Sequence, residues 1–275
     1  AALEAKKIAL GLDQPIYVQY FVWLGQLLHG NLGYSIKSYQ PVSEMIASHL
    51  GPTLLLMGVS LIVSLVFAVP AGIYSAIHQY EKGDYAVVTI SFLGSSIPGF
   101  FLSLLLIYVF TVKLGWLPAF GVGGIKYWIL PVVSTAFAGV TTMARQMRSG
   151  MLEVIHSDYI TMARAKGVRE RAVVYRHALP NALIPVITVA SMSFGTSLGG
   201  TLIAETIFSI PGVGVYIINA VNNRDYPAVE GGVILLAITF SVIMLLTDLL
   251  IAAVDPRVKA QITGDKKRRK EAVKA

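Results

Sequence analysis

The chain has 275 residues, of which 55% are hydrophobic and 13% charged, and its mean hydropathy is +0.67. Soluble domains carry about 25% charged residues, so this composition excludes a soluble fold and indicates an all-α polytopic membrane protein. The formal net charge is +7, but the basic residues gather at the ends of apolar segments, where orientation in a lipid bilayer explains them and no nucleic-acid partner is expected. The chain contains no cysteine, which excludes disulfides and thiolate metal sites.

Residues 1–52 precede the first long apolar segment, and we predict that they form an extracytoplasmic segment. Within them, an aromatic-rich run from Tyr17 to Leu28 follows Pro15, which suits a first helical turn, and stops at Gly30. The run predicts an amphipathic helix that lies at the outer membrane interface.

Residues 53–254 are predicted to form the transmembrane domain. A spanning helix needs about 20 mainly apolar residues. Five segments meet or approach this length: Thr53 to Ile77, Ala86 to Val112, Tyr127 to Ala144, Ala182 to Ala204, and Gly231 to Val254.

The Lys and Arg residues predict the orientation of these spans. Seven lie from Arg145 to Arg176, eight lie from Arg257 onward, and Lys82 lies between the first two spans, so 16 of 22 fall on one side. By the positive-inside rule this side is cytoplasmic, which makes residues 255–275 a basic cytoplasmic tail. Five spans then begin outside, and we expect a sixth, N-terminal span that this sequence lacks, through truncation or processing.

The loop at residues 145–180 is a large basic interruption between apolar segments. Asp158, or Ser157 before it, suits the N-cap of a helix from Tyr159 to Lys166, and Gly167 suits its left-handed end. Pro180 and Pro185 predict a bend where the chain re-enters the membrane. A short helix held in this way suits docking into a cleft of a cytoplasmic partner.

Two stretches of this loop carry a family resemblance. D-Y-I-T-M-A-R-A-K-G-V starts at Asp158, and R-H-A-L-P-N-A-L-I-P starts at Arg176. They resemble the cytoplasmic motif of permease subunits of ATP-binding-cassette importers: E-A-A, three residues, Gly, nine residues, then Ile, any residue, Leu-Pro. Aligned on Gly167, the spacing is intact, while Glu, the first Ala and Ile are replaced. The motif positions fall on Thr161, Met162, Ala163, His177, Leu179 and Pro180.

Further motifs along the chain are similar to the dipeptide, oligopeptide and nickel permease group. Together with the loop they cover essentially the whole chain in order. They are G-L-D-Q-P from Gly11, H-G-N-L-G-Y-S from His29, E-T-I-F-S-I-P-G-V-G from Glu205, N-R-D-Y-P from Asn223 and D-P-R from Asp255.

The resemblance implies the fold of a type I importer permease in a bacterial or archaeal cytoplasmic membrane. It also implies a coupling helix that sits in a groove of an ATP-binding subunit and is supported by His177, Leu179 and Pro180. The implied partners are a second, homologous permease, two ATP-binding subunits that hold ATP and Mg, and an extracytoplasmic solute-binding protein. The implied coupling residues are Asp158, Tyr159, Ile160, Thr161, Met162, Ala163, Arg164, Ala165, Lys166 and Gly167.

The sequence contains no phosphate-binding loop of the form G-x-x-x-x-G-K-[ST], so the chain is not expected to be an enzyme or to bind a cofactor. Its five histidines show no spacing typical of a metal site. We therefore predict import of di- or oligopeptides by an ATP-driven complex. Nickel, a metal chelate, glutathione or another small solute remain alternative cargoes, and a channel or secondary transporter is the alternative class.

The pathway residues are not identified by the sequence, although small residues repeat every four positions in the fourth span. Ser191, Gly195 and Gly199 form one such row, which suits packing either against the second permease or within this chain. Ser193, Ser197 and Thr201 form a neighbouring row.

Two polar features remain. Asp248 lies inside the last span, and Arg145 or Arg148 is its expected partner. The long loop between Ala204 and Gly231 is predicted to hold a short helix from Val215 to Val221, and either gates the outer mouth, meets the solute-binding protein, or simply connects two spans.

Overall fold

The computed structural model describes the backbone of residues 13–254, and within them all side chains except those of 196, 198–200, 247, 248 and 250–254. The predicted basic tail and the side chain of Asp248, for which Arg145 or Arg148 is the expected partner, therefore lie outside the described part of the structure. The described chain is helical, with one isolated bridge between Tyr34 and Pro41 and no strand. The elements are α2 (Ile16–Leu28), α3 (Val42–Ile77), α4 (Lys82–Ser96), α5 (Gly99–Leu106), the π-helix η1 (Ile107–Lys113), α6 (Ile125–Ile155), α7 (Asp158–Ala165), α8 (Glu170–Ala172), the π-helix η2 (Val173–Ala178), α9 (Leu179–Phe208), α10 (Val213–Asn222) and α11 (Tyr226–Val254).

Four helical stretches are long and apolar enough to cross a membrane. They lie in α3, in α6, in the run from Glu170 to Gly195, and in α11. Two further apolar pairs are bent at a short break: α4 with α5 and η1 by 100°, and Thr201–Phe208 with α10 by 83°. The described chain is thus an all-α, polytopic fold.

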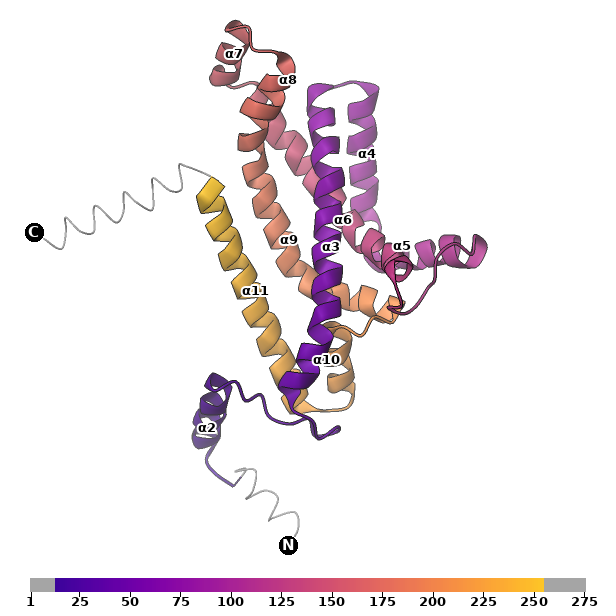
Figure 1. Ribbon diagram of the computed structural model, residues 1–275, viewed down its shortest axis with the longest axis vertical. Helices are drawn as coiled ribbons and strands as arrows, with labels where there is room; N and C mark the ends of the chain where they lie inside the picture. The colour runs from indigo at the N-terminus through magenta and orange to yellow at the C-terminus, as the bar shows by residue number, and fades with distance from the viewer. Residues whose placement is uncertain (1–12, 255–275) are drawn as a thin grey trace, which may run out of the picture.

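The second predicted span, Ala86 to Val112, is not one straight helix. It breaks between Ser96 and Gly99, where Ile97 is extended and Pro98 precedes the first residue of α5. Proline lacks the N–H that an α-helix needs and pushes the residue before it out of the helical region. The prediction missed this break because the whole segment is apolar. In Figure 1 α5 runs sideways, at a large angle to α4, instead of continuing it.

The first predicted span begins too late. α3 starts at Val42 and runs for 36 residues, with Pro52 and Pro70 inside it, so the expected boundary at Thr53 lies within a helix. This part of α3 contains the polar residues Ser48 and His49 and the proline Pro52. A helix end that extends beyond the hydrocarbon core tolerates polar residues and proline. The other predicted helices, including the interfacial run in α2 and the short helix in α10, are confirmed with shifted ends.

Close contacts at glycines hold the bundle together. A Cβ atom added to Gly72 of α3 would lie 2.5 Å from Cβ of Met147 in α6, and one added to Gly139 of α6 would lie 2.5 Å from Oγ of Ser64 in α3. Small residues let two helix backbones approach closely, which is the usual packing mode in a membrane. α6 therefore packs along α3, and its other side packs on α9.

The predicted grouping of basic segments matches the arrangement of the helices. In Figure 1 the α3–α4 turn, α7 and α8 lie at the upper end, and α2 and α10 lie at the lower end. Among residues 13–254, the basic segments α7 and α8 and the turn that holds Lys82 thus lie at one end of the molecule.

Candidate coupling site

The helix predicted to dock on a partner is α7, and both of its ends are defined by local geometry. Ser157, the N-cap residue, is extended, and Asp158 lies in the first turn, where a carboxylate interacts favourably with the helix dipole. At the other end Gly167 has φ +75°, its N–H donates to the carbonyl of Arg164 (2.9 Å), and the N–H of Val168 donates to the carbonyl of Ala163 (3.3 Å). These two bonds form a Schellman motif, which confirms the predicted left-handed end.

One side of α7 is anchored in the core of the bundle. Ile160 is fully buried, and Ala163 and Val168 are half-buried against the same cluster. Full burial of an Ile side chain contributes about 1.5–3 kcal/mol. The cluster joins α3, α6, α7, η2 and α9 through Ile73, Met147, Met151, Val174, Ala182 and Val186, among others. α7 is therefore packed in one cluster with the ends of α6 and α9.

The other side of α7 is exposed and mixed in character. Met162 is 59% exposed and Tyr159 is 44% exposed, and Lys166 and Asp158 are also at the surface. Thr161, Arg164 and Ala165 are exposed as well. Exposed Met and Tyr side chains beside charges are typical of a surface that fits a partner.

Two side-chain contacts fix the loop around α7. Arg164 donates two hydrogen bonds to the carboxylate of Glu170, with Nη2 at 2.6 Å and Nε at 3.1 Å. Asn181 of α9 donates from Nδ2 to the hydroxyl of Tyr159 at 2.9 Å. A bidentate Arg–carboxylate pair is directional as well as attractive, so the two contacts hold the surface of α7 in one orientation.

The three support residues occupy different environments. Leu179 is half-buried and packs on the cluster that holds Ile160, whereas the side chains of His177 and Pro180 are exposed. The carbonyl of His177 accepts a hydrogen bond from Asn181 (3.3 Å), and Pro180 lies in the first turn of α9. The six-residue π-helix η2 leads directly into α9 at this point.

A cleft of about 430 Å³ lies beside α7, between it and the facing ends of α6 and α9. Tyr159 and Asn181 line it together with Glu153 and Pro185. Among the side chains described within residues 13–254, no three His, Asp or Glu cluster as metal ligands.

Comparison with known proteins decides the family. Residues 68–260 match the family described as the inner membrane component of binding-protein-dependent transport systems. A Brucella ovis protein named as a peptide permease is 40% identical over 94% of this chain and 85% of its own length. A glutathione transport system permease protein of Escherichia coli strain K12 is 39% identical over 94% of this chain and 84% of its own length. The chain belongs to this permease family.

Solved structures agree on the fold. An inward-facing methionine ABC transporter chain is similar with a TM-score of 0.65 and 21% identity, over 77% of this chain and 96% of that chain. A chain of an amino acid ABC transporter crystallised with histidines has a TM-score of 0.55 and 17% identity, over 78% and 94% respectively. The permease therefore shares the fold of these ABC transporter chains, and its family places it in the inner membrane as a multi-pass protein.

A buried ion pair at the same end of the molecule as α7 was not predicted from the sequence. Arg148 of α6 donates to both carboxylate oxygens of Asp84 in α4, at 2.6 and 2.8 Å, and Ser75 of α3 also donates to that carboxylate. The backbone N–H of Tyr80 completes the set at 3.0 Å. Arg148 is thus engaged by Asp84, and Arg145 lies over the ring of Phe92 at 5.3 Å. The pair ties the α3–α4 turn to α6.

A second buried carboxylate lies at the opposite end of the permease. Glu205 of α9 is fully buried, and its carboxylate accepts hydrogen bonds from the hydroxyl of Thr53 in α3 (2.6 Å) and from the N–H of Val215 in α10 (3.1 Å). The N–H of Val213 donates in turn to the Thr53 hydroxyl (2.9 Å). No ion pair joins Glu205 to a basic side chain among those described in residues 13–254, and its carboxylate lies at the N–H groups that start α10.

The glycines of the motif that starts at Glu205 now have a structural reason. A Cβ atom at Gly212 would lie 2.2 Å from the Glu205 carboxyl carbon, and one at Gly214 would lie 2.9 Å from Oε2. Glycine is required where a carboxylate approaches the backbone this closely. The motif therefore encodes a polar junction of α3, α9 and α10.

Near the lower end in Figure 1, hydrogen bonds join the loop before α3 to the loop before α11. The buried Asp225 carboxylate accepts from the hydroxyl of Ser35 and the N–H of Ile36, and Lys37 donates to Asn223. Burial alone would raise the pKa of Asp225, but the hydrogen bonds from Ser35 and from backbone N–H groups together hold the pKa below its usual range.

The contacts of Asp225 predict that the loop at residues 34–41 is sensitive to acid. Because the folded pKa of Asp225 is depressed, its stabilisation is fully present above the unfolded value of about 3.9 and is lost as pH falls through the folded pKa. We expect amide exchange at residues 34–41 to stay constant from pH 7 to pH 5, after correction for intrinsic rates, and to accelerate below about pH 4. Asp225→Asn should exchange rapidly at every pH, and equal pH profiles for the two proteins would contradict the assignment.

Proposed function

We propose that this chain is the permease subunit of an ATP-driven importer of di- or oligopeptides, and that α7 couples it to ATP hydrolysis in a partner. The main support is the anchoring of α7: a helix that ends in a Schellman motif at Gly167, with Ile160 in the core and Met162 exposed. A rigid helix with an exposed apolar anchor suits a groove in a partner protein. Membership of the family favours this function over a channel or a secondary transporter.

The proposed assembly contains a second, homologous permease, two ATP-binding subunits with their ATP and Mg, and an extracytoplasmic solute-binding protein. In it, α7, the α3–α4 turn and the basic tail face the cytoplasm, because the Lys and Arg residues gather there. Movement of an ATP-binding subunit shifts α7, and the buried cluster around Ile160 passes the shift to α6 and α9.

The peptide cargo is supported by the Brucella ovis relative, which is named as a peptide permease at 40% identity. Glutathione is the second candidate, since the Escherichia coli relatives at 39% identity are named as glutathione permeases. The solute-binding partner distinguishes these cargoes: titration of purified partner with trialanine and with glutathione shows which ligand it retains.

The overall function is tested by reconstitution. We expect proteoliposomes that carry the assembled complex to accumulate labelled trialanine only with the solute-binding protein and hydrolysable ATP. Affinity purification of this chain in a mild detergent should also recover an ATP-binding subunit. Uptake that persists without ATP, or recovery of the chain without any ATPase, would contradict the proposal.

The coupling role of α7 is tested by Met162→Glu. The side chain is 59% exposed, so we expect unchanged folding, while a charge placed at the centre of an apolar contact should reduce uptake and peptide-stimulated ATP hydrolysis at least tenfold. Glu81→Lys, in the exposed α3–α4 turn at the same end of the molecule, is the matched control and should retain activity. Normal uptake by Met162→Glu would remove α7 from the coupling interface.

A further inference from the structure

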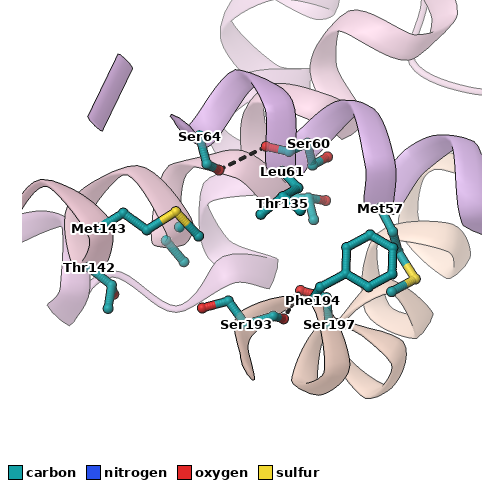
Figure 2. A pocket seen from close by; sticks show the side chains of 12 residues that line it. Met57, Ser60, Leu61, Ser64, Thr135, Thr142, Met143, Ser193, Phe194 and Ser197 are labelled. Atoms are coloured by element: carbon teal, nitrogen blue, oxygen red, sulfur yellow. Dashed lines mark hydrogen bonds between the residues drawn. The ribbon is translucent and has the colours of Figure 1, made fainter. Parts of the chain in front are cut away.

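A half-open cavity of about 190 Å³ lies between α3, α6 and α9, away from the coupling site. Its lining residues fall near the middle of all three helices, at positions 57–64, 135–143 and 193–197. Figure 2 shows the side chains that line it. In a chain that spans the membrane this places the cavity near the midplane of the bilayer.

The cavity is polar but carries no charge. Its twelve lining residues include no Asp, Glu, Lys, Arg or His, and hydroxyl groups supply the polar side chains: Ser60, Ser64, Thr135, Thr142, Ser193 and Ser197. A lone ammonium or carboxylate would lose its hydration there without an opposite charge, at a cost of several kcal/mol. The lining therefore suits an uncharged polar group.

The hydrogen bonds of the hydroxyls define what kind of group this is. The Ser64 hydroxyl lies 2.8 Å from the carbonyl of Ser60 and 2.9 Å from that of Ala136 and shares its one proton between them, and Ser197 donates to the carbonyl of Ser193 (2.7 Å). A serine hydroxyl has one proton and two lone pairs. Because their protons are committed to the backbone, Ser64 and Ser197 offer lone pairs, which accept N–H donors.

Thr135 differs from these serines. Its Oγ1 atom is one of two buried side-chain N or O atoms in the described chain that have no hydrogen-bond partner; the other belongs to Thr111 of η1, outside this lining. An unpaired buried hydroxyl is costly to folding. A ligand carbonyl in the cavity is the partner that this hydroxyl lacks.

The apolar part of the lining comes from Met57, Met143 and Phe194. Methionine side chains adapt to ligands of different shape, and surfaces rich in them tolerate varied partners. The whole cavity is smaller than the roughly 300–1,000 Å³ typical of sites that enclose a ligand. It therefore fits one segment of a peptide and leaves the remainder outside this chain.

We propose that this cavity is a binding subsite for the peptide group of the cargo, with Thr135 donating to its carbonyl and Ser64 and Ser197 accepting from its N–H groups. The inference rests on the proposed import of peptides and assigns the place where this permease holds them. Recognition of the backbone through neutral hydroxyls, next to adaptable side chains, accepts peptides of different sequence.

The absence of cysteine from this chain allows a direct test in the assembled complex. Ala138→Cys places a thiol in the lining, and Val133→Cys, on α6 but outside the lining and 42% exposed, is the matched control. We expect saturating trialanine to slow labelling of Cys at 138 by a small thiol reagent at least fivefold, read from the mass of this chain, and to leave position 133 unchanged. Trialanine methylated at its amide nitrogens should protect much less.

The hydroxyl of Thr135 is tested in the Ala138→Cys background. Thr135→Val should raise the trialanine concentration for half-protection about tenfold, since one hydrogen bond to the ligand is lost, without lowering Tm. Ser134→Ala, a buried neighbour that donates to the carbonyl of Pro131 and lies outside the lining, should leave protection unchanged. A lower Tm for Thr135→Val with unchanged protection would assign the hydroxyl to folding and overturn the proposal.

The two proposals fail in different ways. Equal labelling with and without trialanine, in a complex that imports trialanine with ATP, means that the cavity holds only water and overturns the subsite alone. A complex that imports no peptide with its solute-binding protein and ATP overturns the proposed function, whatever the labelling shows. Glutathione in the same two assays distinguishes a glutathione cargo from a general peptide cargo.

Discussion

Replacing Arg148 by methionine is expected to destabilise the permease by about 3 kcal/mol, because Asp84 keeps its charge in a buried site and loses both hydrogen bonds from the guanidinium. The estimate takes the lower end of the usual range for a broken buried pair, since the Arg148 side chain is 23% exposed. Thermal unfolding of the purified protein in detergent measures the loss. Peptide uptake should fall with it, because the α3–α4 turn is no longer tied to α6.

Two further variants separate the ion pair from general packing. Arg145→Met, one turn earlier on α6, removes a cation that lies over Phe92 and should cost less than about 1 kcal/mol. The double change of Asp84 to Asn and Arg148 to Met should cost less than Arg148→Met alone, since no unpaired charge stays buried. Asp84→Asn alone completes the double-mutant cycle. If the losses of stability of Asp84→Asn and Arg148→Met add up to that of the double variant, the two side chains do not interact.

Glu205→Ala is the second large expected effect, with a loss of about 3 kcal/mol. The change leaves a cavity and removes the acceptor of the Thr53 hydroxyl and of the Val215 N–H, both buried or half-buried. We expect α10 to detach from α3 and α9, which faster amide exchange in residues 213–222 would report. Unchanged exchange there would contradict the proposed junction.

Glutamine at the same position should be milder, at about 1 kcal/mol. Its oxygen still accepts from Val215, and its amide can donate to Thr53, whose proton can turn to the carbonyl of His49 at 3.4 Å. Thr206→Ala, the exposed neighbour on α9, is the control and should be close to neutral. A Gln variant as damaged as the Ala variant would mean that the charge itself, at the start of α10, dominates the junction.

Some predictions from the sequence held because their causes are local. The boundaries of α7 follow from the extended Ser157 before it and the left-handed Gly167 after it, and the short helix α10 follows Gly212 and ends at the asparagines Asn222 and Asn223. Apolar length located the spans. It failed at Ile97 and Pro98, where a single proline outweighs the hydropathy of the 27 residues from Ala86 to Val112.

The row of small residues in α9 illustrates a choice that the sequence left open. A Cβ atom at Gly195 would lie 2.1 Å from the ring of Phe240 in α11, so this position packs within the chain. Ser193 and Ser197, on the neighbouring face, line the cavity instead. Spacing of four residues predicted close packing but could not say against which helix.

The sequence by itself determined the membrane class, the approximate spans, the family and the two ends of α7, since each depends on composition or on residues a few positions apart. Only the tertiary structure decided the partners of Asp84 and Glu205 and the lining of the cavity. Arg148 is 64 positions from Asp84, and Thr53 is 152 positions from Glu205. Such pairs depend on the rotation and depth of each helix, which are set by packing at Gly72, Gly139 and Gly195.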